Sequence, residues 1–438
     1  MKKFLLPFFV MLPFVLPAQE ADSLRIVAQL ESEGRYIAHT VDKTGRVLVL
    51  RAKRDPGSTV NNCYYDGCLT ELLRFTALDK KPETVALFRW PVQAHDLAVD
   101  SSGNILVAAG ETIRDTVVRR LRYKGQVLKY DASLNLLSKK EITGGMPVKM
   151  YITRSNYYFL FRQQDTLKFG TLVCPQEKTF YYYDNAAVLK TDMNFTVSWF
   201  ATRPVEGMFQ DGEGITVSPG GAVAVYTNTC ILRRADHHDA HIFYFNPAGE
   251  MNWHKQFTCS PYGGCLGSNM CRAIVFEKNN ELIASVSSAT AMLSWAANDT
   301  LSHDAEIRNR HLDKNWKPGG QEKSGYSAAT EQQLVFFRPS GQFESVPVPG
   351  SLCHAQFFRD GETLCMLQTS TTYRHPDYSY STKLVKLNKD THALKNAGVA
   401  KGNLLLVSNG GKYCTADNRS YNPYHDKFVL YEMLLRGK

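Results

Sequence analysis

Residues 95–110 read HDLAVDSSGNILVAAG. Apolar side chains stand on both sides of a central polar turn, Asp100-Ser-Ser-Gly103, as they do where two short strands meet. Asp, Ser and Gly supply the side-chain hydrogen bonds and the positive φ angle that a tight turn requires. The stretch therefore predicts a β-hairpin, and it is the clearest copy of a pattern that recurs along the chain.

The same order of strand, polar turn and strand occurs six more times. These copies are residues 37–51, 148–161, 213–226, 272–286, 354–367 and 403–415. A second kind of hairpin alternates with them, at residues 71–90, 127–141, 188–200, 242–257, 334–348 and 383–394. Regular alternation of two hairpin types indicates a repeat architecture.

The count of seven first and six second hairpins leaves one strand over at each end, residues 24–30 and 428–434. We expect these two strands to pair, because their pairing would close a ring and leave no exposed edge. The sequence thus predicts an all-β fold, a seven-bladed β-propeller of four-stranded antiparallel blades in one domain spanning residues 19–438. The predicted blades lie near residues 36–90, 95–142, 148–200, 213–257, 272–348, 354–396, and 403–434 with 24–30. The alternative, a pair of sandwich domains, would need a linker near the middle, where no Pro/Ser/Gly-rich stretch occurs.

The blade that contains AVDSSGNILVA (98–108) and VLKYDASLNLL (127–137) resembles the NHL repeat and related seven-bladed propeller repeats. The resemblance is clear over about one blade and weak elsewhere. It implies the propeller architecture and leaves the activity open, because propellers include enzymes, receptors and scaffolds.

The first 18 residues have the pattern of a secretory signal, with Lys2 and Lys3, an apolar core and Ala18 at the cleavage position. We expect an exported protein, periplasmic, associated with the outer membrane or extracellular, with no membrane span of its own. The net charge of +9 is spread along the chain without a basic block, so no nucleic-acid partner is expected. Export favours disulfides, and the candidates are Cys63, Cys68, Cys230, Cys259, Cys265 and Cys271.

Alignment of the seven first hairpins places one equivalent residue of each blade at the mouth of a central channel. The set is Ile37, His95, Val148, Glu213, Arg272, His354 and Asn403. Its five polar members, His95, Glu213, Arg272, His354 and Asn403, are the candidate ligand-binding rim, suited to an anionic or sugar-like ligand, or to a metal held by His95, His354 and Glu213. Solvent-exposed strand ends are commonly polar, so the competing interpretation is a rim that binds no ligand.

A second candidate is the run Asp236-His-His-Asp-Ala-His241, in which His237, His238 and His241 could ligate a metal. A solvated loop is the simpler interpretation, and no resident cofactor is predicted. Residues 289–333 form a long insertion, which together with several Cys-bearing loops we expect on the same face as the channel mouth.

Two functions remain open. The first is a binding or scaffold protein that engages a protein partner of the cell envelope or outer membrane through its loop-rich face. The second is a carbohydrate-active or metal-dependent lyase or hydrolase that uses the polar channel mouth. No nucleophile elbow, phosphate-binding loop or dinucleotide fingerprint occurs, so the first is preferred and catalysis is left undecided.

Overall fold

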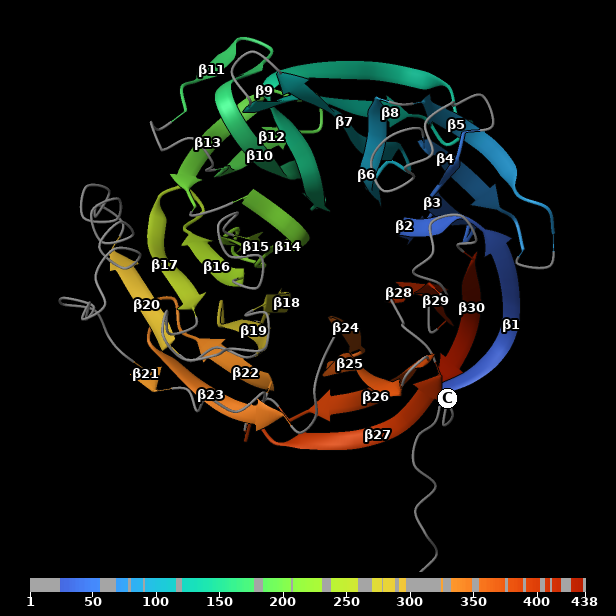
Figure 1. Ribbon diagram of the computed structural model, residues 1–438, viewed down its shortest axis with the longest axis vertical. Helices are drawn as coiled ribbons and strands as arrows, with labels where there is room; N and C mark the ends of the chain where they lie inside the picture. Colours follow the sequence, from blue (N-terminus) through green and yellow to red (C-terminus); the bar gives the residue numbers. More distant parts are fainter. Residues whose placement is uncertain are drawn as a thin grey trace, which may run out of the picture.

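The computed structural model describes residues 24–55, 68–77, 80–89, 91–115, 120–176, 184–205, 208–230, 238–258, 270–277, 279–287, 291–296, 324–325, 332–348, 354–374, 377–388, 391–401, 406–409, 412–418 and 427–435. The candidate signal segment lies outside these ranges. Every regular element within them is a β-strand, and Figure 1 shows the strands grouped in sheets around a central axis. No helix in this part of the chain has the length and hydropathy to cross a membrane.

Three sheets each contain four antiparallel strands, in the order expected from the two hairpin types. The first contains β2 (Arg35–Val41), β3 (Val47–Arg54), β4 (Cys68–Phe75) and β5 (Glu83–Arg89). Another contains β18 (Met270–Phe276), β19 (Leu282–Ser287), β22 (Gln332–Phe337) and β23 (Phe343–Val348). The third contains β24 (His354–Asp360), β25 (Thr363–Arg374), β26 (Asp377–Leu387) and β27 (Leu394–Lys401).

A further four-stranded sheet joins the two ends of the described chain. Its strands are β28 (Leu406–Asn409), β29 (Lys412–Asn418), β30 (Lys427–Leu435) and β1 (Leu24–Glu33). β1 pairs antiparallel with β30, from Leu24 opposite Leu435 to Glu33 opposite Lys427. The two leftover strands of the sequence therefore pair with each other.

The largest sheet has eight strands, because one long strand belongs to two groups of four. They are β6 (Val92–Val99), β7 (Ile105–Asp115), β8 (Arg120–Tyr130), β9 (Leu136–Ile152), β10 (Asn156–Phe169), β11 (Leu172–Cys174), β12 (Asn185–Asp192) and β13 (Val197–Pro204). β9 has 17 residues. Its first part pairs with β8 and its second part with β10, so it ends one group of four strands and begins the next.

The remaining sheet contains β14 (Met208–Val217), β15 (Val223–Cys230), β16 (His238–Phe245), β17 (Met251–Thr258), β20 (Ala291–Ala296) and β21 (Ser324–Gly325). β20 lies in the predicted insertion 289–333, and it pairs with β17. The insertion thus adds strands to the preceding sheet. Most of its other residues lie outside the described ranges.

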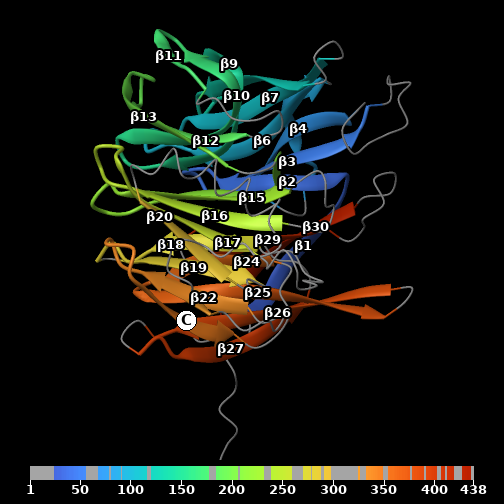
Figure 2. The same cartoon turned by 60° about the vertical axis from the view of Figure 1, so that its left-hand side comes forward.

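The innermost strands of neighbouring sheets are in contact around the axis. β2 contacts β6, β6 contacts β9, β9 contacts β14, β14 contacts β18, β18 contacts β24, β24 contacts β28, and β28 contacts β2. Apolar side chains fill the spaces between adjacent sheets, for example Leu50 of β3 with Leu97 of β6. Figure 2 shows the sheets stacked in this way, with the β25–β26 hairpin projecting from one side.

Candidate functional site

At five of the seven predicted rim positions, the pairing of the innermost strand with its neighbour is irregular. In β6 the register passes from Ala94 opposite Ala109 to Asp96 opposite Ala108, so His95 has no opposite residue in β7. Ile37 in β2, Val148 in β9 and Arg272 in β18 stand at the same kind of irregularity, and Glu213 lies in the irregular stretch of β14 between Gln210 and Gly214. An extra residue of this kind interrupts the alternation of a strand and re-aims its side chain.

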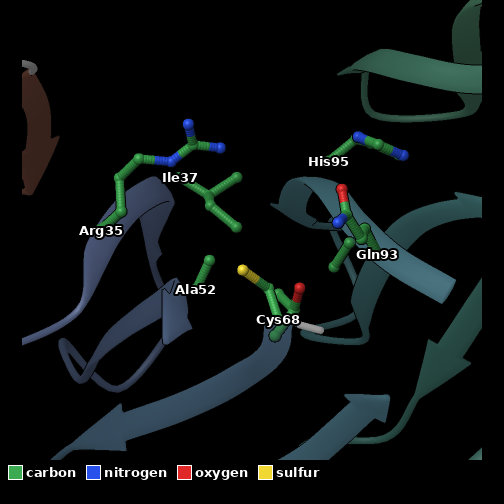
Figure 3. Close-up of a pocket in the computed structure, with 8 residues that line it drawn as sticks. Arg35, Ile37, Ala52, Cys68, Gln93 and His95 are labelled. Carbon is green, nitrogen blue, oxygen red and sulfur yellow. The ribbon is translucent and has the colours of Figure 1, made fainter. Parts of the chain in front are cut away.

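A small cavity opens beside two of these positions, between β2 and β6. Its volume is about 90 Å³. The lining side chains include the guanidinium of Arg35, the amide of Gln93 and the imidazole of His95, with Ile37 and Cys68 among the others. Figure 3 shows Arg35 and His95 on opposite sides of this cavity, the first from β2 and the second from β6.

The imidazole of His95 is the most unusual group of the cavity. Its Nε2 atom is buried and makes no hydrogen bond within the described residues. Burial lowers the pKa of His95 to about 3, and the positive charges of Arg162 and Lys149 add to the decrease. At neutral pH the ring is therefore uncharged, and its buried Nε2 atom has no partner in the part of the chain that the structure describes.

Arg162 of β10 connects His95 with a second predicted rim residue. Its Nε donates to Oε1 of Glu213 at 2.7 Å, which forms an ion pair between two neighbouring sheets. The phenol of Tyr123 lies close to this pair. Burial raises the pKa of Tyr123 well above its usual value, the carboxylates of Asp184 and Glu213 add to the rise, and Arg162 opposes it. Arg162 thus pairs with Glu213, and its positive charge contributes to keeping the ring of His95 uncharged.

Asp96 ties the strand of His95 to the next innermost strand. Its Oδ2 accepts a hydrogen bond of 2.7 Å from the backbone N–H of Met150, and its Oδ1 lies 3.7 Å from Nζ of Lys149. Both partners are on β9. This bridge between β6 and β9 fixes the position of His95 from the side opposite the cavity wall formed by β2.

The other rim candidates are less completely placed. The backbone carbonyl of Arg272 accepts a hydrogen bond of 3.1 Å from the Tyr226 phenol. His354 begins β24 opposite Thr369 in a regular ladder without a bulge, which distinguishes it from His95. Asn403 lies outside the described residues.

The structure places His241, one of the three histidines of the predicted metal site, in the core. This residue is fully buried in β16, where Nδ1 lies 3.1 Å from Nε2 of His254 and Nε2 lies 3.3 Å from Oγ1 of Thr229. Both ring nitrogens make contacts inside the sheet, so His241 is a core residue, and metal binding by this run stays a prediction. His238 begins β16 opposite Cys230, and His237 lies outside the described residues.

Two of the candidate disulfide cysteines, Cys68 and Cys271, are buried and carry free thiols in the structure. Sγ of Cys271 lies 3.7 Å from the carbonyl oxygen of Ala273, in the core between two sheets. The disulfides expected from the sequence stay a prediction. Cys68 lies in the cavity wall and Cys230 ends β15, whereas Cys63, Cys259 and Cys265 lie outside the described residues.

Arg35, Gln93 and Arg162 were not singled out from the sequence. Arg35 and Gln93 lie two residues before the rim positions of their strands, so the strand period of two would have placed them near the same mouth. Arg162 has a different signal: it is a lone charge that directly follows the apolar run YYFLF at residues 157–161. A buried arginine in such a run requires a carboxylate partner, and Glu213 is that partner.

The fold and site together define a propeller-like, all-β protein with a polar cavity near its axis. No family model and no curated protein sequence matches the chain. Among solved structures it is similar to the virginiamycin B lyase from Staphylococcus aureus, at 10% identity and a TM-score of 0.44, covering 93% of this chain and 99% of that chain.

Two further structures are similar to this chain. One is an ulvan lyase from a new family of polysaccharide lyases, at 12% identity and a TM-score of 0.47, covering 94% of this chain and 96% of that chain. The other is an α-L-arabinofuranosidase from Fusarium graminearum, at 9% identity and a TM-score of 0.39, covering 83% of this chain and 99% of that chain. At these values the likenesses assign neither a family nor an activity.

Proposed function

We propose that this chain is a closed seven-bladed β-propeller that binds an acidic saccharide at the cavity between β2 and β6. The blade count takes the eight-stranded sheet as two blades joined by β9 and each of the other five sheets as one. The β1–β30 pairing and the unbroken contacts between innermost strands support closure. The observation that carries the ligand proposal is the buried Nε2 of His95, which has no hydrogen-bond partner among the described residues and lies in a cavity also lined by Arg35.

The cavity volume limits what can enter. The cavity measures about 90 Å³, which leaves room for a few water-sized groups. Pockets that enclose a whole small molecule measure roughly 300–1,000 Å³. The cavity therefore takes one group of a larger ligand, and the rest of that ligand lies along the channel.

The lining chemistry favours an anionic group next to a hydroxyl. Arg35 offers a planar fork of N–H donors that matches a carboxylate or a sulfate. Neutral His95 offers an acceptor at Nε2 if Nδ1 carries the proton, and Gln93 offers both a donor and an acceptor. Carboxylates and hydroxyls occur side by side in uronic acids, so an oligosaccharide of this kind is the ligand class proposed.

Binding can be tested by calorimetric titration of the protein with uronate-containing oligosaccharides and with neutral oligosaccharides of equal length. We expect binding of the acidic series only. Arg35→Gln and His95→Phe should each weaken it at least about tenfold, the loss of about one charge-assisted hydrogen bond. Arg89→Gln, on an exposed arginine of β5, is the matched control. Equal binding by wild type and both cavity variants would exclude this site.

Catalysis is a separate question with its own readout. A group with a pKa of about 3 is a weak proton acceptor near neutral pH, which favours binding over general-base chemistry at His95. Incubation with acidic polysaccharides, followed by measurement of chain length and of ultraviolet-absorbing unsaturated ends, separates the two. Shortening with unsaturated ends would establish a lyase, shortening without them a hydrolase.

Two long hairpins favour a second function, docking of a protein partner of the cell envelope. The β7–β8 ladder continues to Asp115 opposite Arg120, and the β25–β26 ladder to Arg374 opposite Asp377. Both extend past the start of the innermost strand of their sheets, on the cavity face. Affinity capture from native envelopes, with a variant shortened in residues 370–381, tests this function, and an unchanged set of captured proteins would count against it.

Export is proposed from residues 1–18 alone. The expected mature protein begins at Gln19 and is recovered outside the cytoplasm. Fractionation of the native cells with sequencing of the mature N-terminus tests this, and an uncleaved cytoplasmic product would refute it.

A further inference from the structure

Three side chains that could ligate a metal lie together on the face where the innermost strands end. The cavity lies on the opposite face, where these strands begin. Glu281 stands in the turn between β18 and β19, Glu344 is on β23, and His392 is in the turn between β26 and β27. The first two belong to one sheet and the third to its neighbour. The group therefore bridges two sheets that are distant in sequence from the cavity.

The donor atoms are close enough for a shared cation. One ligand atom from each side chain lies within 4.8 Å of the others. His392 Nδ1 and Glu344 Oε1 are already 3.1 Å apart. With metal–ligand bonds of about 2.1 Å, neighbouring ligand atoms of a tetrahedral site are about 3.4 Å apart. A bound cation would draw atoms that now lie up to 4.8 Å apart to about that spacing.

The imidazole is held in place by its surroundings. Its ring stacks on buried Phe336, with centroids 3.8 Å apart and an interplanar angle of 9°. Phe336 is directly opposite Glu344 in the β22–β23 ladder. One cross-strand pair therefore positions both the ring on which His392 stacks and the carboxylate that faces His392. His392 itself has a φ angle of +54° in a turn closed by a 2.9 Å hydrogen bond from Asn388 N to Ala393 O.

A neighbouring carboxylate does not compete for the imidazole. Glu277 has its own ion pair with Arg359 at 3.0 Å. Glu281 and Glu344 therefore face His392 as two carboxylates against one imidazole, a nitrogen and oxygen donor set that suits divalent zinc and related transition metals.

We propose that Glu281, Glu344 and His392 bind a divalent cation of the zinc type that links the two sheets. This site is independent of the proposed saccharide function. It differs from an ordinary ion pair between a protonated imidazole and Glu344, which would need no metal and would stabilise the protein without any cation.

The experiment is titration of chelator-treated full-length protein with Co²⁺, followed by displacement with Zn²⁺. We expect one Co²⁺ equivalent with visible bands and without the thiolate charge-transfer absorption that a cysteine site would give. Glu281→Gln and His392→Asn should each weaken this equivalent by more than about 100-fold, because losing even an outer-shell partner costs about 10- to 100-fold. Asn is chosen at 392 because it tolerates positive φ.

Glu250→Gln is the matched control, since this glutamate occupies the β16–β17 turn with its own partner, Asn246. Circular dichroism and thermal midpoints check that every variant is folded. Zn²⁺ should raise the midpoint of wild type and of Glu250→Gln, and leave that of the two site variants unchanged. The proposal is overturned if wild type binds no N/O-coordinated equivalent, or if folded Glu281→Gln and His392→Asn bind it as wild type does.

Discussion

The phenol of Tyr157 donates a hydrogen bond of 2.7 Å to Oδ2 of Asp100. Asp100 is buried in the β6–β7 turn, where its Oδ1 also accepts the backbone N–H groups of Ser102 and Asn104, each at 2.8 Å. Tyr157 is on β10 in the next group of strands. One carboxylate therefore shapes the turn that defines the repeat and attaches it to the neighbouring sheet.

We predict that Tyr157→Phe lowers the free energy of unfolding by about 1.5–3 kcal/mol, the usual contribution of a hydrogen bond to a charged group. Urea unfolding of wild type and variant measures the difference. The control is Tyr130→Phe, because Tyr130 is also buried and burial alone, with no hydrogen bond contributing, raises the pKa of its phenol. Equal losses in the two variants would show that ring packing, and not the bond to Asp100, is responsible.

Asp100 should also make stability depend on acid pH. Burial alone would raise its pKa, but hydrogen bonds from Asn104, Tyr157 and Ser102 outweigh burial and lower it below the ordinary value. Since the pKa is lower in the folded state, this stabilisation is present above the unfolded value of about 3.9 and is lost as pH falls through the folded value. Urea unfolding between about pH 6 and pH 3 should show a smaller decline for Asp100→Asn. An identical decline would rule Asp100 out as a contributor.

Glu213→Gln should cost about 3 kcal/mol, because it leaves the buried Arg162 guanidinium without the carboxylate that it contacts. The contrast is Arg89→Gln, which removes an ion pair whose arginine side chain is 65% exposed and should cost less than about 1 kcal/mol. Denaturant midpoints of the two variants give both numbers. A loss below 1 kcal/mol for Glu213→Gln would mean that Arg162 is adequately compensated by its other neighbours.

The imidazole of His95 should not titrate near neutral pH. Its pKa of about 3 keeps it neutral between about pH 5 and pH 8, whereas an unperturbed histidine titrates near 6.5. NMR of ¹⁵N-histidine-labelled protein, with His95→Phe to assign the resonance, measures this directly. A titration step near 6.5 for that resonance would show that Nε2 is solvated in solution and would remove the basis for its role in the cavity.

The hairpins were predictable because turn chemistry is local. All seven first hairpins are present as antiparallel strand pairs, and so are the six second hairpins. The continuous course of β9 and the pairing of β20 with β17 were missed. Both features depend on which strands become neighbours in the folded protein, and local sequence patterns do not show this.

The positions of the candidate residues on the strands could be predicted from the sequence, whereas their contacts could not. Aligning the turns selected His95, Glu213 and His354 alike, but β24 has no bulge at His354, and the ion pair of Glu213 with Arg162 depends on a residue from a different strand. The contacts of His241 with His254 and Thr229 come from adjacent strands, which a linear run of His and Asp does not reveal.

The double membership of β9 has a consequence for how the protein opens. Residues 136–143 of this 17-residue strand pair with β8 and residues 142–152 pair with β10, so only Ile142 and Thr143 belong to both ladders. Opening of the β8–β9 ladder as far as Thr143 therefore also unpairs the end of the β9–β10 ladder, and amide exchange should be coupled between the two groups of strands at this point.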